Sequence, residues 1–230
     1  TGVAGLGKSR LLADFHARLR AARARAILIR ANPGDRAVSA GFLAAVAEAL
    51  AQLPGAKAIS SESAGVLVAL APSLASHFPR AVPDASQGED VARRRAGAVL
   101  DLLRAVSDEA PLALLIDDLH WTDAESRRVL DAVAARIESG RLLLVLATRP
   151  PLEQLGGFQV LRRLELARFD LARVVEFCTR LGELPSEPWA ADLPVRLLSA
   201  TQGVPLAIIE ALQRLIETGA LRLADHVWHC

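Results

Sequence analysis

Residues near the start of the sequence carry its strongest chemical signal. Residues 2–9 read GVAGLGKS and match the pattern G-x-x-x-x-G-K-[ST] without a gap. Glycines let such a loop curl so that successive backbone N–H groups face phosphate oxygens, and the N-terminus of a following helix adds a favourable dipole. The pattern predicts that Lys8 reaches the β- and γ-phosphates of a nucleoside triphosphate and that the Ser9 hydroxyl binds Mg²⁺. The nucleotide-contacting residues predicted here are Gly2, Gly5, Leu6, Gly7, Lys8, Ser9 and Arg10.

Two acidic residues after an apolar run form the second signal. Residues 112–116 read LALLI, and Asp117 and Asp118 follow. Carboxylates at the end of a buried strand need a cation or hydrogen bonds, and a Mg²⁺ ion shared with Ser9 would supply the cation. Because consecutive strand residues point to different sides, we assign Asp117 to the metal and Asp118 to polarising the attacking water. A surface turn is the alternative, but the phosphate-binding loop upstream favours the metal site.

A basic residue follows the next apolar run. Arg149 comes directly after residues 142–147 and before Pro150. In a parallel sheet its guanidinium would emerge on the same edge as Asp117, where it would contact the γ-phosphate and report its presence. The alternative is a solvated loop arginine. The catalytic residues predicted from the sequence are therefore Lys8, Asp118 and Arg149.

The hydrophobic pattern around these motifs predicts an α/β fold with a parallel sheet. Apolar runs indicate strands, and a 3.6-residue apolar period indicates helices. The order strand, helix, strand favours parallel pairing with right-handed crossovers. Thr122, with Glu125 three residues later, predicts a capping box for the helix that precedes the last apolar run. The predicted strands are 26–30, 112–116, 142–147 and 161–166, and the predicted helices are 9–23, 41–53, 63–70, 93–107, 126–138, 171–181, 189–200 and 205–218.

Composition places the chain among ordinary globular proteins. It has 230 residues, 52% hydrophobic and 23% charged, with a net charge of +1. This balance gives no sign of a nucleic-acid or membrane surface. The longest aliphatic run, 142–147, is far shorter than the roughly 20 residues that cross a bilayer. Two cysteines provide no disulfide framework, which is typical of a cytoplasmic protein, so we expect a cytoplasmic location and no membrane partner.

Four segments carry a resemblance to a known family. They are GVAGLGKSRLL at 2–12, LALLIDDLHWTDAES at 112–126, LLLVLATRP at 142–150 and TQGVPLAIIEAL at 201–212. With them the chain resembles the AAA-type ATPase domain of STAND signal-transduction NTPases. This type occurs in large ATP-binding LuxR-type transcriptional regulators of bacteria and in related adenylate-cyclase or kinase-linked proteins.

The resemblance implies a fold, a domain order and cofactors. The fold would be a P-loop NTPase sheet flanked by helices, followed by a small helical domain whose Gly203 and Pro205 lie near the nucleotide. The start of a winged-helix module containing Trp228 would follow. The implied domains are 1–168, 169–218 and 219–230, with ATP or ADP and Mg²⁺ as cofactors and Pro205 as a nucleotide contact.

The resemblance also implies a switch between ATP-bound and ADP-bound forms, biased by an inducer or regulatory protein. Self-association would belong to the ATP state, and DNA would be contacted only through domains outside this chain. We expect a fragment truncated at both ends. The strand that precedes the phosphate-binding loop in the family would lie upstream, and the effector domains would lie downstream.

Three functions are compatible with these residues. The first is a signal-transduction switch that binds ATP and hydrolyses it slowly, because Asp118 is one methylene shorter than a glutamate and no arginine finger can be assigned. The second is a scaffold that binds nucleotide with little or no hydrolysis. The third is a P-loop small-molecule kinase, which the absence of an obvious lid segment and the presence of Gly203-x-Pro205 disfavour.

Overall fold

The structure, a computed structural model, describes residues 1–88, 90–136, 141–149 and 162–230. The chain divides into two compact units. One is Ser9–Arg163, and the other joins Thr1–Lys8 to Leu164–Cys230. We call them the sheet unit and the C-terminal unit. The domain boundary near Phe169 stays a prediction.

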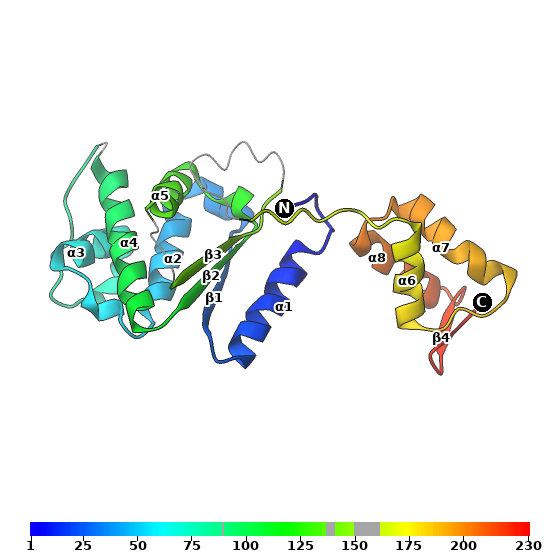
Figure 1. Ribbon diagram of the computed structural model, residues 1–230. Coiled ribbons are helices and arrows are strands. Elements are labelled where there is room, and N and C mark those ends of the chain that lie inside the picture. The colour runs from blue at the N-terminus through cyan, green and yellow to red at the C-terminus, as the bar shows by residue number, and fades with distance from the viewer. Residues whose placement is uncertain (89, 137–140, 150–161) are drawn as a thin grey trace. The chain divides into compact units, whose positions relative to one another are not determined.

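A parallel β-sheet forms the centre of the sheet unit (Figure 1). Its three strands are β1 (Arg25–Arg30), β2 (Leu112–Asp117) and β3 (Leu142–Leu146), in the order β1-β2-β3. Both neighbouring pairs are parallel, and the register places Arg30 opposite Asp117. The strands predicted at 26–30, 112–116 and 142–147 are confirmed, and so is their parallel arrangement.

Helices cover both faces of this sheet. All of β2 is buried, and its side chains alternate between the two faces. On one face Leu115 packs with Leu12 of α1 (Lys8–Ala21). On the other face Leu114 belongs to a larger cluster. That cluster contains residues of α2 (Gly41–Ala51), α3 (Ser61–Leu70), α4 (Asp90–Glu109) and α5 (Ala124–Ala134). The mixed α/β fold with a helix-flanked parallel sheet is thus confirmed.

The start of α5 differs from the predicted capping box. Asp123, not Thr122, is the N-cap, and its carboxylate accepts a hydrogen bond from the backbone N of Ser126 (2.9 Å). Glu125 does not reach back to the cap, because its carboxylate pairs with Arg95 of α4. The predicted box was therefore wrong by one residue. The sequence DAES also satisfies the preference for an N-cap acid.

The strand predicted at 161–166 is wrong for residues 162–166, which have no strand assignment, while residue 161 lies outside the described residues. Leu164 and Leu166 do form backbone hydrogen bonds with Thr1: the Thr1 amino group donates to Leu164 O (2.5 Å), and Leu166 N donates to Thr1 O (2.9 Å). Residues 163–166 do alternate charged and apolar side chains, the pattern on which the strand prediction was based. Two hydrogen bonds to one residue do not make the ladder of paired residues that defines a strand.

Three helices and a hairpin form the C-terminal unit. The elements are α6 (Leu171–Leu181), α7 (Pro188–Thr201), α8 (Pro205–Glu217), β4 (Arg222–Ala224) and β5 (Val227–His229). The hairpin is antiparallel, and its Trp228 is 1% exposed. The indole N–H of Trp228 donates to Cys178 O (3.0 Å). Burial raises the pKa of the Cys178 thiol, which lies in this unit's core. The helices predicted at 171–181, 189–200 and 205–218 lie in this unit, while a separate small helical domain stays a prediction.

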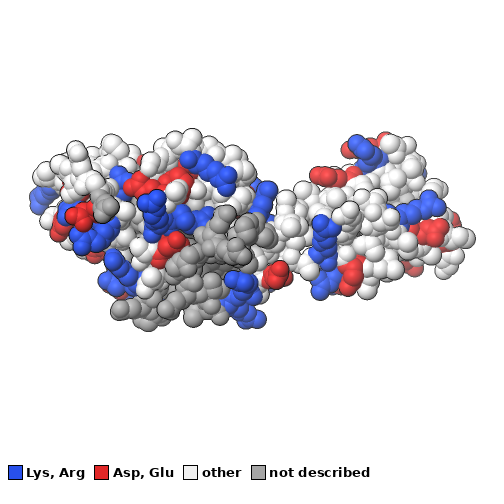
Figure 2. Space-filling view, turned by 90° about the horizontal axis from the view of Figure 1, so that it is seen from above, with Lys and Arg blue, Asp and Glu red and all other residues white. Residues whose placement is uncertain are grey.

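Two surface properties follow from the composition. Figure 2 shows Lys and Arg side chains beside Asp and Glu side chains over the face in view, consistent with a net charge of +1. Among the described residues, no helix combines the length and the apolar character needed to cross a membrane.

Candidate functional site

The loop that leads into α1 depends on glycine. Gly5 (φ 79°) and Gly7 (φ 93°) adopt left-handed conformations that other residues rarely take. A Cβ atom on Gly5 would lie 2.7 Å from Cγ1 of Val204, closer than packed atoms approach. The loop therefore needs glycine at position 5 for backbone freedom and for space.

Lys8 lies inside its own loop. Its side chain is buried, and Nζ donates hydrogen bonds to the carbonyl oxygens of Gly2 (2.7 Å) and Val3 (2.8 Å). Both of these acceptors are neutral carbonyl oxygens, and they belong to a loop that ends at the N-terminus of α1. Such a position attracts phosphate. The contact between Lys8 and phosphate stays a prediction.

The start of α8 packs against the same loop. Leu206 N donates to Gly5 O (3.2 Å), and Pro205 is the first residue of α8. The residue that the family resemblance assigned to the nucleotide is therefore next to the phosphate-binding loop within the C-terminal unit. Proline suits this first helical position because it has no N–H to leave unpaired.

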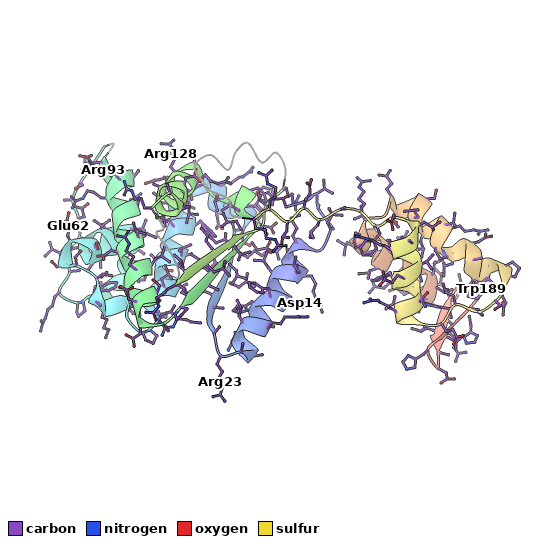
Figure 3. The ribbon with its side chains drawn as sticks, in the orientation of Figure 1. Asp14, Arg23, Glu62, Arg93, Arg128 and Trp189 are labelled. Carbon is purple, nitrogen blue, oxygen red and sulfur yellow. The ribbon has the colours of Figure 1, made fainter. Side chains whose placement is uncertain are left out.

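Three further predicted contacts lie around the start of α1. Leu6 is 8% exposed, and Ser9 is part-buried as the second residue of the helix. Arg10 instead lies on the exposed side of α1 and pairs with Asp14 (3.1 Å), which Figure 3 labels on this helix. The Arg10 side chain is thus engaged along its own helix, as an i,i+4 surface pair.

Asp117 and Asp118 end the central strand in a buried position. They are 4% and 6% exposed, respectively. Asp117 Oδ1 accepts a hydrogen bond from Asp118 N (2.9 Å). Asp118 has a left-handed backbone (φ 53°, ψ 38°), so it no longer follows the alternation of the strand. The expectation that the two carboxylates point to different sides was wrong for this reason, because both approach one guanidinium group.

That guanidinium belongs to Arg30, which is not among the site residues predicted from the sequence. Its Nε and Nη2 donate to Asp118 Oδ2 at 3.1 and 2.9 Å, and Nε lies 3.8 Å from Asp117 Oδ2. The hydrogen bond and the charge of Asp118 raise the pKa of Arg30 above its ordinary value, so this group stays charged. One feature of the sequence could have identified Arg30. It is a charged residue directly after the apolar run 26–29, just as Asp117 directly follows the apolar run 112–116.

The segment after Asp118 is fixed by a second arginine. Arg36 donates through Nε (3.1 Å) and Nη2 (2.6 Å) to His120 O, and its guanidinium lies 4.7 Å from the ring centroid of Trp121. The His120 ring is also close to the aspartates, with Nδ1 3.9 Å from Asp118 Oδ1. Arg36 therefore holds the backbone that follows the two acids.

Asp123 ties the same segment to α2. Its Oδ1 accepts from the backbone N of Ala40 (2.9 Å), and its Oδ2 accepts from Ser126 Oγ (2.5 Å). Burial alone would raise the pKa of Asp123, but the hydrogen bonds from Ser126 and Ala40 outweigh it and hold the pKa below its ordinary value. Ser126 Oγ in turn accepts from Leu43 N (3.0 Å). These hydrogen bonds hold Asp123 and Ser126 against the start of α2, within the sheet unit.

The end of β3 lies beside this segment. Ala147 N donates to Ile116 O (2.8 Å), and Leu119 N donates to Ala147 O (2.9 Å). Thr148 is buried and Arg149 is exposed. Since β2 and β3 are parallel, residues 147–149 emerge at the edge of the sheet that carries Asp117. The role of Arg149 stays a prediction, and Pro150 lies outside the described residues.

The available oxygen donors fit magnesium that arrives with a nucleotide. In the described part of the chain no group of three or more His, Cys, Asp or Glu residues could hold a metal ion by itself. Mg²⁺ at phosphate-transfer sites takes one or two protein ligands, and substrate phosphates and water complete its shell. The Ser9 hydroxyl and the Asp117 carboxylate are hard oxygen donors of this kind.

Comparison with known proteins places the chain in a family. Residues 1–146 match the family model described as AAA ATPase domain. An uncharacterized protein of Rhizobium meliloti (strain 1021) is 33% identical over 170 residues, which cover 65% of this chain. The chain spans 16% of that relative's length.

Proposed function

Because the chain belongs to the AAA ATPase domain family, we propose that it binds ATP with Mg²⁺ at residues 2–9 and hydrolyses it slowly as a signal-transduction switch. The observation that carries this proposal is the phosphate-binding loop. The charged end of Lys8 is enclosed by loop carbonyl groups, directly at the N-terminus of α1. A loop of this kind neutralises and orients phosphate groups, which is most of what phosphoryl transfer requires.

Most of the predicted residues have a role in this proposal. The loop N–H groups and Lys8 hold the phosphates, Ser9 and Asp117 hold the metal, and Asp118 orients the attacking water. Bound Mg²⁺ would neutralise charge on the β- and γ-phosphates. Arg149 contacts the γ-phosphate, and Pro205 contacts the nucleotide from the start of α8. Hydrolysis is slow because the Asp118 side chain is one methylene shorter than that of a glutamate.

The biological setting of the switch is proposed on the family resemblance. We assign the chain to a STAND-type regulator of the LuxR group that acts in the cytoplasm, responds to an inducer or regulatory protein and self-associates in the ATP state. DNA contact would come from other domains of the whole protein. In this reading residues 169–218 are the helical domain and the β4–β5 hairpin begins a winged-helix module.

A matched pair of lysine variants tests the nucleotide site. Lys8→Ala removes the ammonium from the loop, whereas Lys57→Ala removes the other lysine of the chain, which is exposed. Isothermal titration calorimetry with Mg·ATP is expected to give at least about 100-fold weaker binding for Lys8→Ala and no change for Lys57→Ala. Wild-type affinity retained in Lys8→Ala would contradict the proposal.

One observation favours a nucleotide-binding scaffold as the second candidate function. Arg30 already engages the carboxylate assigned to the attacking water, at 2.9 Å. Asp118→Asn separates the two readings when ATP turnover is measured under single-turnover conditions. The switch proposal predicts that the rate falls at least about tenfold while Mg·ATP affinity stays within a few-fold. An unchanged rate would favour the scaffold.

A further inference from the structure

Arg30 is a charged residue beside Asp117 and Asp118, and the proposed function gives it no role. It ends β1, the strand next to β2, and the parallel register aligns it with Asp117. It donates two hydrogen bonds to one oxygen of Asp118 and lies 3.8 Å from an oxygen of Asp117. Both aspartates therefore share one cation from a neighbouring strand.

The exposure of the three side chains is unequal. The side chain of Arg30 is 63% exposed, whereas those of Asp117 and Asp118 are 6% and 9% exposed. Two adjacent buried carboxylates need a positive charge, because burial removes most of the water that would stabilise them. Arg30 supplies that charge from the solvent side. Its guanidinium can therefore move into water without disturbing the core.

The contacts with the two aspartates are also unequal. Arg30 binds Asp118 through a single oxygen, Oδ2, while its 3.8 Å separation from Asp117 Oδ2 is too long for a hydrogen bond. Asp117 is thus the acid that Arg30 engages less, and it is also the acid assigned to magnesium. A divalent ion at Asp117 would lie close to the guanidinium and repel it.

We propose that Arg30 is the resident counter-ion of Asp117 and Asp118, and that Mg²⁺ entering with the nucleotide displaces it. This inference rests on the proposed function, since it assumes that ATP binds together with Mg²⁺ at this site. The exchange keeps the two carboxylates neutralised with and without nucleotide. It also makes magnesium compete with a residue of the protein for the same charges.

Competition between Arg30 and Mg²⁺ for the two aspartates changes how much Mg²⁺ strengthens the binding of ATP. We define the magnesium coupling ratio as the Kd for ATP in EDTA divided by the Kd for ATP in saturating Mg²⁺. Without Arg30, metal-free ATP meets two carboxylates that lack their counter-ion and binds more weakly. Mg·ATP meets no competing cation and binds at least as tightly. The ratio therefore rises when the charge of Arg30 is removed.

The test compares Arg30→Met with Arg25→Met by calorimetry. Arg25 begins the same strand, and its guanidinium donates to Val106 O (2.9 Å) and Pro54 O (3.2 Å), not to a carboxylate. Arg30→Met is expected to raise the magnesium coupling ratio about tenfold, because one unit charge a few ångströms away is removed. Arg25→Met is expected to leave the ratio at its wild-type value.

Two further variants separate charge from hydrogen bonding and from folding. Arg30→Lys keeps the charge and is expected to keep the ratio within about twofold of wild type. Arg30→Gln keeps a hydrogen-bond donor without the charge, so it is expected to raise the ratio as Arg30→Met does. Arg30→Gln also serves as the test if Arg30→Met does not unfold cooperatively on heating.

The outcomes distinguish this inference from the proposed function. If the wild-type protein binds Mg·ATP and neither neutral variant changes the ratio, Arg30 is not the counter-ion and only the inference is overturned. A rise with Arg30→Lys equal to that with Arg30→Met would overturn it as well. If the wild-type protein does not bind Mg·ATP at all, the proposed function is wrong and the inference falls with it.

Discussion

The phosphate-binding loop and the aspartate pair are built in different ways. The loop takes its groups from consecutive residues, and its charged residue, Lys8, donates to the neutral carbonyl oxygens of Gly2 and Val3. The aspartate pair draws on separate segments, and its charge is matched by Arg30 from another strand. In the proposed function, an incoming phosphate meets the ammonium of Lys8, whereas an incoming cation replaces Arg30.

The two regions also differ in what supports them. The loop packs on Val204 and Leu206 at the start of α8, in the C-terminal unit. The aspartates end the central strand of the sheet unit, and Asp123 secures the segment that follows them. A substitution in one core should therefore change one region and leave the other intact.

The largest expected effect is a loss of stability in the C-terminal unit, whose α8 packs against the loop. Trp228→Ala empties a fully buried site and leaves Cys178 O without its indole donor, so the C-terminal unit should lose about 3–5 kcal/mol of stability. Trp189→Ala is the control, since Trp189 is only part-buried on α7 (Figure 3). Its indole N–H donates to Glu187 Oε2 (2.5 Å).

Hydrogen exchange measured by mass spectrometry would check this. In Trp228→Ala, protection should fall in α6 and α8 and stay at wild-type levels in β2. Equal loss of protection in β2 would show that the two units do not have independent cores.

A smaller effect is expected from the loop itself. Gly5→Ala adds a Cβ atom 2.7 Å from Val204 Cγ1 at a residue with φ 79°. Backbone strain of about 1–2 kcal/mol, added to this clash, should weaken Mg·ATP binding at least about tenfold. Gly34→Ala is the matched control, because an added Cβ there meets nothing within 4 Å. Calorimetry should find wild-type affinity for Gly34→Ala, and an equal affinity for Gly5→Ala would contradict this account of the loop.

The smallest effect concerns the segment after the aspartates and depends on pH. The native pKa of Asp123 lies below its ordinary value, so its carboxylate stabilises the fold above about pH 4 and loses that contribution as the pH falls further. Asp123→Asn should cost about 1–2 kcal/mol at pH 7. The difference in unfolding free energy between wild type and variant, measured in urea, should shrink towards zero in acid. A difference that stays constant from pH 7 to pH 3 would contradict this.

Much of the fold could be predicted because it depends on local pattern. The buried run at 112–116 became β2, and the apolar period at 171–181 became α6 with the predicted bounds. The cap of α5 could not be placed with the same certainty. Thr122 and Asp123 are both good N-caps, and contacts with α2 and α4 decide between them.

The candidate site also combines features that a local sequence pattern predicts with features that depend on contacts between distant residues. A loop motif can be read from consecutive residues, and its predicted glycine-dependent geometry is consistent with the positive φ angles of Gly5 and Gly7. Arg30 could not be found in this way. It meets Asp118 across 88 positions of sequence, and only the register of β1 on β2 brings them together. The left-handed backbone conformation of Asp118 could not be predicted either, because residue type alone does not specify the φ angle.

The central claim is that one Mg·ATP engages Lys8 through phosphate and Asp117 through the metal. Calorimetric titration of ATP in EDTA and in Mg²⁺ tests it most directly when Lys8→Ala is compared with Asp117→Asn. We predict that Lys8→Ala weakens binding in both conditions. Asp117→Asn should weaken binding only in Mg²⁺, since in EDTA it removes a negative charge that repels phosphate. An Asp117→Asn variant that retains the full magnesium dependence of the wild type would contradict the account.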